Sequence, residues 1–244
     1  MRSIRKEAEM KVAAIQFKPR RGDPSGSLRQ LVKLARKAAA DADLVVLPEM
    51  VTGYAFDDPG EVRSIAEHPK GRTFAALAPI ARDHECWIIA GFAEVAGERL
   101  FNSAMVIRPD GELDGVYRKT LLFDADLPWA QPGGGDYPLF EIDGVLCTVG
   151  ICMDLNDNRF TRWCALERVD VVALPTCWVE ETDPVWPFWQ RRMLGLNATL
   201  VAADQWGEDG SMTYAGRSAI LSAREIVAGA SAEGDAIVVA DLQS

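Results

Sequence analysis

The sequence predicts a layered α/β fold in which two β-sheets pack face to face beneath outer helices. Patterns of buried strands alternate with helical patterns along most of the 244 residues. In addition, "DLVVLPE" (Asp43–Glu49) is nearly repeated by "DVVALPT" (Asp170–Thr176), and a helical pattern precedes each of them. This repetition indicates two βα halves. Because no change in composition marks a linker, we expect a flexible leader over residues 1–10 and a single domain over residues 11–244.

The first half is expected to begin with a buried strand, "KVAAIQF" (11–17). Within 27–42, apolar residues recur at helical spacing with charged residues between them, which predicts a helix. The second buried strand ends at Pro48, because proline has no amide hydrogen to donate to a sheet. A helix over 73–85 then leads to a strand over 86–95.

Two β-hairpins are expected in the middle of the chain. In 100–120, two apolar runs flank a Pro-Asp-Gly turn, and in 139–151 an Asp-Gly turn joins two shorter ones. A loop rich in proline and glycine, 126–138, separates the two hairpins.

The second half continues with a helix over 159–168 and the strand Asp170–Thr176. Short strand patterns then fill the end of the chain, at 199–204, 218–223, 225–233 and 236–242. In a layered α/β protein, chemistry gathers beyond the carboxyl ends of strands, so the residues that follow these strands are the first candidates for a site.

Composition and charge exclude several classes of function. A net charge of −10 argues against nucleic acid or an anionic membrane as the main partner. No run approaches the ~18 apolar residues of a membrane span, and the charged N-terminus lacks the apolar core of a signal peptide. The five cysteines form no CxxC pair, which favours free thiols in a reducing, cytoplasmic setting. His68 and His84 lack ligand spacing, so we expect surface histidines and no metal site.

Three reactive side chains follow predicted strands: Glu49, Lys119 and Cys152. Taken singly, each has an ordinary structural explanation, since cysteine is often buried in cores and charged residues are often solvated. Cys152 differs from the other four cysteines because it lies where a strand gives way to a helix. The N–H groups of a helix start favour a thiolate. We expect the other four cysteines to be core residues.

With no suitably placed histidine, the proton of a nucleophilic thiol must pass to another group. Transfer from a free thiol (pKa ~8.5) to a free glutamate (pKa ~4.3) is uphill by roughly 5–6 kcal/mol. Burial raises the pKa of a glutamate and a nearby ammonium lowers that of a thiol, so a dry pocket can close this gap. Glu49 would then act as general base and acid, and Cys152 would attack a carbonyl or nitrile carbon. Lys119 and the backbone N–H of Met153 would stabilise the oxyanion.

The segments "LVVLPE", "YRKT" and "GICMD" resemble the three catalytic motifs of the carbon–nitrogen hydrolase family, also called the nitrilase superfamily. The resemblance extends from "VAAIQF" to "AIVVADL". It implies a four-layer αββα sandwich, with two face-to-face mixed sheets and outer helices, which pairs across helices as a homodimer. It also implies hydrolysis of a non-peptide C–N bond through a thioester at Cys152, with no metal or organic cofactor.

The longer segments "LPEMVTGYAF", "YRKTLLFDADLPW" and "GICMDLN" are similar to those of amidases that deamidate N-terminal Asn or Gln of peptides. We therefore expect a primary amide substrate, either of this type or a small aliphatic amide. A nitrilase or an N-carbamoyl amino acid hydrolase would use the same three residues, as would an acyltransferase. A catalytically silent scaffold or binding subunit is the alternative of another class.

Two positions depart from the pattern of the family. Many members have a second glutamate where this chain has Leu127, and a histidine where it has Leu121. Either Asp126 or Asp124 takes over the role of that glutamate in holding the lysine and the substrate, or the role is absent. These departures leave the three central residues in place.

The pocket walls are expected to include Tyr54 and Trp178, which follow strand ends, together with Asp126. Ordinary aromatic packing is the alternative for both rings. Asp124, Asp126 and Asp154 could attract the cationic α-amino group of a peptide substrate, or could simply be solvated or capping residues.

Overall fold

The computed structural model describes residues 9–53, 58–180 and 184–243, which form two six-stranded sheets. The first sheet has the order β14-β1-β2-β3-β4-β5, and the second has the order β13-β12-β9-β8-β7-β6. The strands of the first sheet are β1 (Glu9–Gln16), β2 (Leu44–Val46), β3 (Trp87–Ala96), β4 (Arg99–Ile107), β5 (Leu113–Arg118) and β14 (Ala236–Gln243). Those of the second are β6 (Leu139–Ile142), β7 (Val145–Val149), β8 (Val171–Thr176), β9 (Thr199–Asp204), β12 (Ala219–Leu221) and β13 (Ile226–Gly229).

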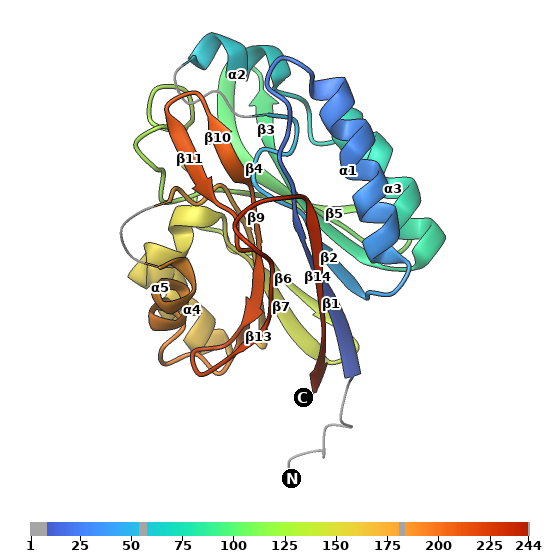
Figure 1. The fold of residues 1–244 in the computed structure, drawn as a ribbon, viewed down its shortest axis with the longest axis vertical. Coiled ribbons are helices and arrows are strands. Elements are labelled where there is room, and N and C mark those ends of the chain that lie inside the picture. The colour runs from blue at the N-terminus through green and yellow to red at the C-terminus, as the bar shows by residue number, and fades with distance from the viewer. Residues whose placement is uncertain (1–8, 54–57, 181–183, 244) are drawn as a thin grey trace.

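Helices cover the outer faces of both sheets (Figure 1). The helices are α1 (Pro24–Ala39), α2 (Pro59–Ile65), α3 (Arg72–His84), the 3₁₀ helix η1 (Cys152–Asn156), α4 (Asn158–Glu167) and α5 (Val185–Arg192). A separate hairpin pairs β10 (Trp206–Asp209) with β11 (Met212–Ala215). In Figure 1, α1 and α3 lie on one side of the molecule, and α4 and α5 lie on the other.

Two apolar cores hold these layers together. Val46 of β2 and Val149 of β7 belong to one buried cluster, so the sheets meet face to face. Leu31 of α1 and Leu77 of α3 pack with the other face of the first sheet. The order of layers is helix, sheet, sheet, helix, and the predicted αββα sandwich is confirmed.

The topology repeats itself in the two halves. β1 leads through α1 to β2, its parallel neighbour, and β7 leads through α4 to β8 in the same way. Each second strand is followed by a helical region and a third parallel strand, β3 or β9. The near-repeat of "DLVVLPE" and "DVVALPT" therefore marks equivalent strands, β2 and β8, in the two sheets.

Three details differ from the prediction. β1 begins at Glu9, which pairs with Gln243, so two residues assigned to the leader belong to a strand. β2 covers only Leu44–Val46, although Leu47 still donates its N–H to Ile89 O at 2.8 Å. The helix α2 and the β10–β11 hairpin were not predicted, because they are short and mixed in polarity.

Local sequence sets the start of the longest helix. The Asp23 carboxylate accepts the N–H of Gly26 at 2.7 Å, and Pro24 occupies the first turn, where a missing N–H costs nothing. Leu31 and Ala35 then face the first sheet. Across the described ranges, the helices are all too short or too polar to cross a membrane.

Candidate active site

Glu49 follows β2 and is buried with both carboxylate oxygens engaged. Its Oε1 accepts hydrogen bonds from Lys119 Nζ at 2.8 Å and from Asn102 Nδ2 at 2.6 Å. Its Oε2 accepts the backbone N–H of Cys177 at 2.7 Å. Oε1 is thus occupied by two donors, and Oε2 by one among the described residues. Oε2 is therefore the oxygen with capacity left to receive a proton.

The backbone around Glu49 is held from two neighbouring strands. On β3, the N–H of Gly91 donates to Pro48 O at 3.0 Å, and a Cβ at Gly91 would collide with the backbone of Glu49. Beyond β9, Gln205 Nε2 donates to Glu49 O at 2.8 Å and to Met50 O at 3.2 Å. Met50 has a positive φ of 51°, a conformation that non-glycine residues rarely adopt. These contacts fix the direction in which Glu49 leaves its strand.

Lys119 follows β5 and lies between two carboxylates. Its Nζ donates to Asp126 Oδ2 at 2.7 Å as well as to Glu49. Asn102 Nδ2, on β4, bridges the same two carboxylates through a second bond to Asp126 Oδ1 at 3.1 Å. Burial alone would lower the pKa of Lys119, but Asp126 and Glu49 outweigh it and raise that pKa well above its usual value. Lys119 is therefore an ammonium ion inside the protein.

The structure distinguishes between Asp126 and Asp124 as partners of the lysine. Asp126 is fully buried, and its Oδ2 also accepts the N–H of Phe123 at 2.9 Å. Asp124 is exposed, and the Leu127 side chain is 63% exposed. The carboxylate that holds Lys119 thus comes from Asp126, one position before Leu127. Whether Asp126 also contacts substrate stays a prediction.

Cys152 begins η1 and has a φ of 44°, which places it in the left-handed region. A non-glycine residue there typically costs about 1–3 kcal/mol, and such strain clusters at functional sites. Burial and the Glu49 carboxylate raise the pKa of Cys152 well above its usual value, while Lys119 and the Thr176 hydroxyl act to lower it. Burial outweighs the effect of the ammonium, so the proton that the sequence analysis assigns to Glu49 has to leave a thiol of raised pKa.

Asp154 organises the loop that carries Cys152. Its buried carboxylate accepts bonds from the backbone N–H groups of Ile151, Thr120 and Leu121 and from the hydroxyls of Thr120 and Tyr117. Burial raises its pKa, although these donors oppose the rise. Asp154 therefore ties the cysteine loop to the chain just after Lys119. Its bond to the N–H of Ile151, the residue that precedes η1, fits the capping alternative of the sequence analysis, and its burial does not fit an exposed charge that attracts a substrate amine.

The predicted oxyanion and pocket residues have different outcomes. Met153 lies in the first turn of η1, where N–H groups have no acceptor within the helix. Trp178 is buried, and its ring centroid lies 5.3 Å from that of Phe188 and 5.7 Å from that of Trp189. These contacts fit the packing alternative, and a substrate contact by Trp178 stays a prediction. Tyr54 lies outside the described residues.

Several supporting residues were missed in the sequence. Asn102 interrupts an otherwise apolar strand pattern, which was its only local signal, and Gln205 directly follows the strand that ends at Asp204. Cys177 was taken for a core residue, and its thiol is indeed buried. However, its backbone N–H is what bonds Glu49, and a backbone donor leaves no trace in a sequence.

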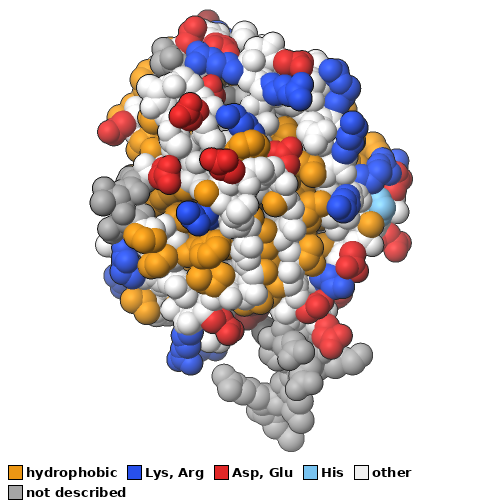
Figure 2. Space-filling model, viewed as in Figure 1, with side chains coloured by type: hydrophobic (Ala, Val, Ile, Leu, Met, Phe, Trp, Pro, Cys, Tyr) orange, Lys and Arg blue, Asp and Glu red, His pale blue; other side chains and the backbone are white. Residues whose placement is uncertain are grey.

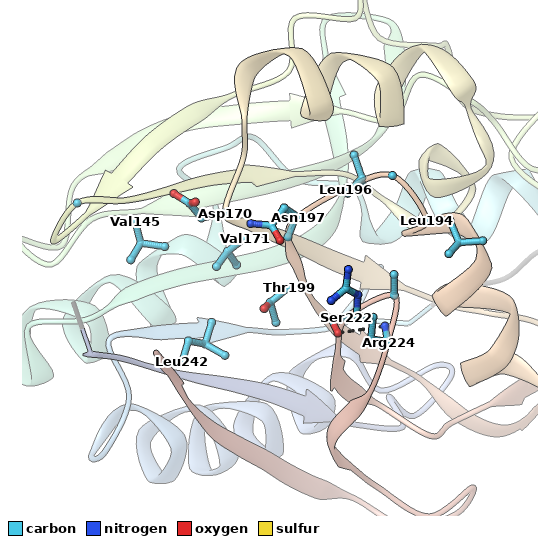
Figure 3. A pocket seen from close by; sticks show the side chains of 14 residues that line it. Val145, Asp170, Val171, Leu194, Leu196, Asn197, Thr199, Ser222, Arg224 and Leu242 are labelled. Atoms are coloured by element: carbon cyan, nitrogen blue, oxygen red, sulfur yellow. Dashed lines mark hydrogen bonds between the residues drawn. The ribbon is translucent and has the colours of Figure 1, made fainter. Parts of the chain in front are cut away.

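A hollow of about 720 Å³ lies at the other end of the second sheet (Figure 3). Val145, Val171 and Thr199 line it at the starts of β7, β8 and β9, and Leu242 and Arg224 complete its wall. Because Cys152 follows the opposite end of β7, this hollow is separate from the cluster around Glu49. Within the described part of the chain, no group of three or more His, Cys, Asp or Glu side chains is arranged to hold a metal.

Over nearly its whole length, the chain is similar in sequence to known proteins. The family model described as "Carbon-nitrogen hydrolase" matches residues 11–244. A protein named nitrilase from Pyrococcus abyssi is 34% identical over 241 residues, which cover 96% of this chain and 89% of that protein. A protein N-terminal amidase from Schizosaccharomyces pombe is 25% identical, over 96% of this chain and 100% of that protein.

A solved structure has the same fold. The amidase from Nesterenkonia sp. AN1, with acrylamide added at its active-site cysteine, superposes with a TM-score of 0.82. It is 22% identical in sequence, and the match covers 96% of this chain and 93% of that one. The similarity supports the αββα architecture.

Proposed function

The chain belongs to the carbon–nitrogen hydrolase family, and we propose that Glu49, Lys119 and Cys152 are the residues with which it hydrolyses a primary amide. The observation that carries this proposal is the placement of Lys119 Nζ, 2.8 Å from Glu49 and 2.7 Å from Asp126 in a buried site. This arrangement keeps a permanent cation beside the thiol without a histidine. Such a cation is what the developing charge of an acyl-transfer reaction requires.

In the first half of the reaction, Glu49 accepts the proton of the Cys152 thiol, and the thiolate attacks the amide carbon. The negative charge moves to the amide oxygen, where the Lys119 ammonium and the Met153 N–H stabilise it. Glu49 then gives its proton to the leaving nitrogen. The C–N bond breaks, ammonia departs, and a thioester remains on Cys152.

In the second half, Glu49 takes a proton from water, and the resulting hydroxide attacks the thioester carbon. The C–S bond breaks, the carboxylic acid leaves, and Cys152 recovers its proton. Two features support the assignment of the base. Glu49 Oε1 is held by Lys119 and Asn102, which leaves Oε2 to exchange the proton, and the Cys177 N–H orients that oxygen.

The proposed substrate is either a terminal Asn or Gln amide of a peptide or a small aliphatic amide. Relatives named protein N-terminal amidase support the first class. The second draws support from the fold shared with an amidase that was crystallised with butyramide. The relative named nitrilase keeps a nitrile as the second candidate.

The test is ammonia release from a panel of substrates. The panel holds short peptides beginning with Asn or Gln, small aliphatic amides, a nitrile and N-carbamoyl amino acids. Cys152→Ala is compared with Cys164→Ala, a matched control because Cys164 is also a buried free thiol but lies within α4. Release from one amide class that is lost only in Cys152→Ala supports the proposal. Equal release from both variants contradicts it, and release from the nitrile alone identifies a nitrilase.

We also propose a homodimer that pairs through the outer helices α4 and α5. Leu166 of α4 is 70% exposed and Leu194, just after α5, is 69% exposed, which is unusual for large apolar side chains. Figure 2 shows hydrophobic side chains gathered over α5 and β13 on the face in view. Sedimentation is expected to give twice the chain mass, and Leu166→Glu is expected to lower it. A cytoplasmic location stays a prediction, supported by five free thiols.

A further inference from the structure

Asn102 lies within β4 and contacts three residues of the candidate active site. Its Nδ2 donates to Glu49 Oε1 at 2.6 Å and to Asp126 Oδ1 at 3.1 Å. Its backbone O accepts the N–H of Lys119 at 2.8 Å. The side chain is fully buried, so water does not compete for these bonds. One residue of β4 thus holds the proposed base, the lysine and the carboxylate that anchors the lysine.

The orientation of the Asn102 amide is fixed by its neighbours. An amide group has two N–H donors on its nitrogen and only an acceptor on its oxygen. Turning it over would place Oδ1 against oxygens of Glu49 and Asp126, which in their ionised form accept bonds and donate none. In the orientation observed, both donors are used and Oδ1 has no partner among the described residues. Buried polar atoms are almost always hydrogen-bonded, so the two donated bonds must outweigh the cost of this oxygen.

The balance of charge in the site gives these two bonds their importance. Glu49 and Asp126 both accept a bond from one atom, Lys119 Nζ. With both acids ionised, as the proposed mechanism requires of Glu49 before it takes the thiol proton, the buried group has one more negative charge than positive. A buried charge is costly unless it is paired and hydrogen-bonded. Asn102 supplies two N–H dipoles to this excess and adds no charge of its own.

We propose that Asn102 is a positioning residue that keeps Glu49 able to accept the proton of Cys152. Its bond to Oε1 leaves Oε2 as the oxygen that takes the proton, and it favours the ionised carboxylate. Its bond to Asp126 keeps that carboxylate in place beside Lys119. Asn102 exchanges no proton itself and acts through Glu49. The inference deepens the proposed function and rests on it.

Ser103, the next residue of β4, provides a matched control. Neighbouring residues in a strand point to opposite faces of the sheet. Ser103 is also fully buried, and its hydroxyl donates to the Glu94 carboxylate at 2.7 Å. Glu94 is held by Arg118, on the face of the sheet away from Glu49. Ser103→Ala therefore removes a buried hydrogen bond to a carboxylate and leaves the bonds of the candidate active site in place.

The test measures amide hydrolysis across pH. Asn102→Leu keeps the approximate size and removes both donors, whereas Asn102→Asp keeps the shape and adds a third carboxylate. We expect kcat to fall about tenfold to hundredfold in both, the worth of hydrogen bonds to a charged group. In Asn102→Leu, the acidic limb of the kcat/KM profile is expected to move up by about one pH unit, because a carboxylate that loses a donor protonates at higher pH. Ser103→Ala is expected to lower the urea midpoint of unfolding but to keep the wild-type kcat and profile.

Other titratable groups lie near Glu49 and contribute to any pH profile. Besides Asp126, the groups whose charges interact with Glu49 are Lys119, Cys152, Cys177, Asp204 and Tyr214. All of them are unchanged in the three variants. A shift that is seen with Asn102→Leu and not with Ser103→Ala therefore comes from the lost amide.

Two results would overturn the role of Asn102. One is a folded Asn102→Leu or Asn102→Asp with the wild-type kcat. The other is an Asn102→Leu that loses activity while its acidic limb stays in place, as a merely structural role would give. Circular dichroism checks folding, and if Asn102→Leu does not fold, the kcat of Asn102→Asp decides.

A second measurement separates this role from the proposed function. Mass spectrometry follows the alkylation of Cys152 by iodoacetamide across pH, which needs no amide turnover. In Asn102→Leu, the acidic limb of the alkylation rate is expected to move up by the same pH unit, because Glu49 must again accept the thiol proton. If the wild type releases no ammonia and this shift is present, the amidase function is refuted and the role of Asn102 is not.

Discussion

The ends of β2 and β8 are built alike but carry different chemistry. In both, an Asp is followed by four apolar residues and a proline, and the next side chain is fully or almost fully buried. After β2 this side chain is Glu49, which is paired with the Lys119 ammonium. In the second half it is Thr176, the last residue of β8, an uncharged hydroxyl near the Cys152 thiol.

The comparison shows that the repeated strand pattern positions a polar side chain in each half, and that the neighbouring elements determine its chemistry. Each copy of the pattern brings one polar side chain to the carboxyl end of its sheet, and the two sheets face each other. At the end of β2, the segment after β5 adds Lys119, which donates to Glu49, and Asp126, which holds Lys119 from its other side. At the end of β8, the neighbouring strand β9 adds Asp204 and no cation. Burial and the Glu49 carboxylate raise the pKa of Asp204, which favours its neutral form.

The largest effect is expected when the Glu49 carboxylate, at the end of β2, is removed. Glu49→Gln keeps the size of the side chain but cannot accept the thiol proton. We expect kcat for amide hydrolysis to fall about a thousandfold, within the range of a lost general base. The exposed Glu98→Gln serves as a control for loss of one negative charge. A Glu49→Gln enzyme that kept more than a tenth of its activity would show that another group is the base.

A smaller loss of activity is expected when Asp126, one of the two carboxylates that hold Lys119, is changed. Asp126→Asn leaves the ammonium with a single carboxylate, Glu49, and weakens its hold on the oxyanion. We expect kcat to fall about tenfold to hundredfold, as for loss of a charged hydrogen bond. Steady-state kinetics would measure it, with the exposed Asp124→Asn as the matched control. Equal activity of the two variants would mean that Asp126 has no part in holding the lysine.

The raised pKa of Asp204, at the end of β9, predicts that the free energy of unfolding depends on pH. The pKa of Asp204 is raised in the folded state, so its carboxyl keeps a proton that the unfolded chain releases above about pH 3.8. Folded wild type therefore loses stability, relative to Asp204→Asn, as pH rises from 3.8 toward the folded pKa. The slope is at most about 1.4 kcal/mol per pH unit. Urea unfolding of both proteins between pH 4 and 7 measures it, and parallel curves would show that Asp204 is ionised.

The smallest effect is expected next to Thr176. Cys177→Ala removes a thiol that donates to Glu49 O at 3.3 Å but keeps the backbone N–H that holds Glu49 Oε2. We expect kcat to fall by less than about threefold and the free energy of unfolding by about 1 kcal/mol. Kinetics and urea unfolding measure the two quantities. A hundredfold loss of kcat would show that the thiol itself acts in the reaction.

The positions of Glu49, Lys119 and Cys152 were predictable because each follows a strand pattern, and strand ends converge in layered α/β folds. The choice between Asp126 and Asp124 as the partner of Lys119 could not be predicted from the sequence. The two aspartates are separated by one residue in a loop, and only the turn at Phe123 decides which one points inward. The roles of Asn102 and of the Cys177 N–H were also hidden. Their partner, Glu49, lies 53 and 128 residues away along the chain.

The order of apolar runs, prolines and turns predicted two repeated βα halves with face-to-face sheets beneath outer helices, and it placed Glu49, Lys119 and Cys152 after strand ends. The resemblance to the carbon–nitrogen hydrolase family implied the αββα sandwich and the catalytic roles of these residues. Periodicity and spacing are local properties, so a sequence displays them directly. Protonation states and hydrogen-bond partners came only with the folded chain. The neutral Cys152, the charged Lys119 and the neutral Asp204 all depend on burial and on charges contributed by distant segments. Desolvation and Coulomb energy are set by distances in space, which packing creates and sequence order does not record.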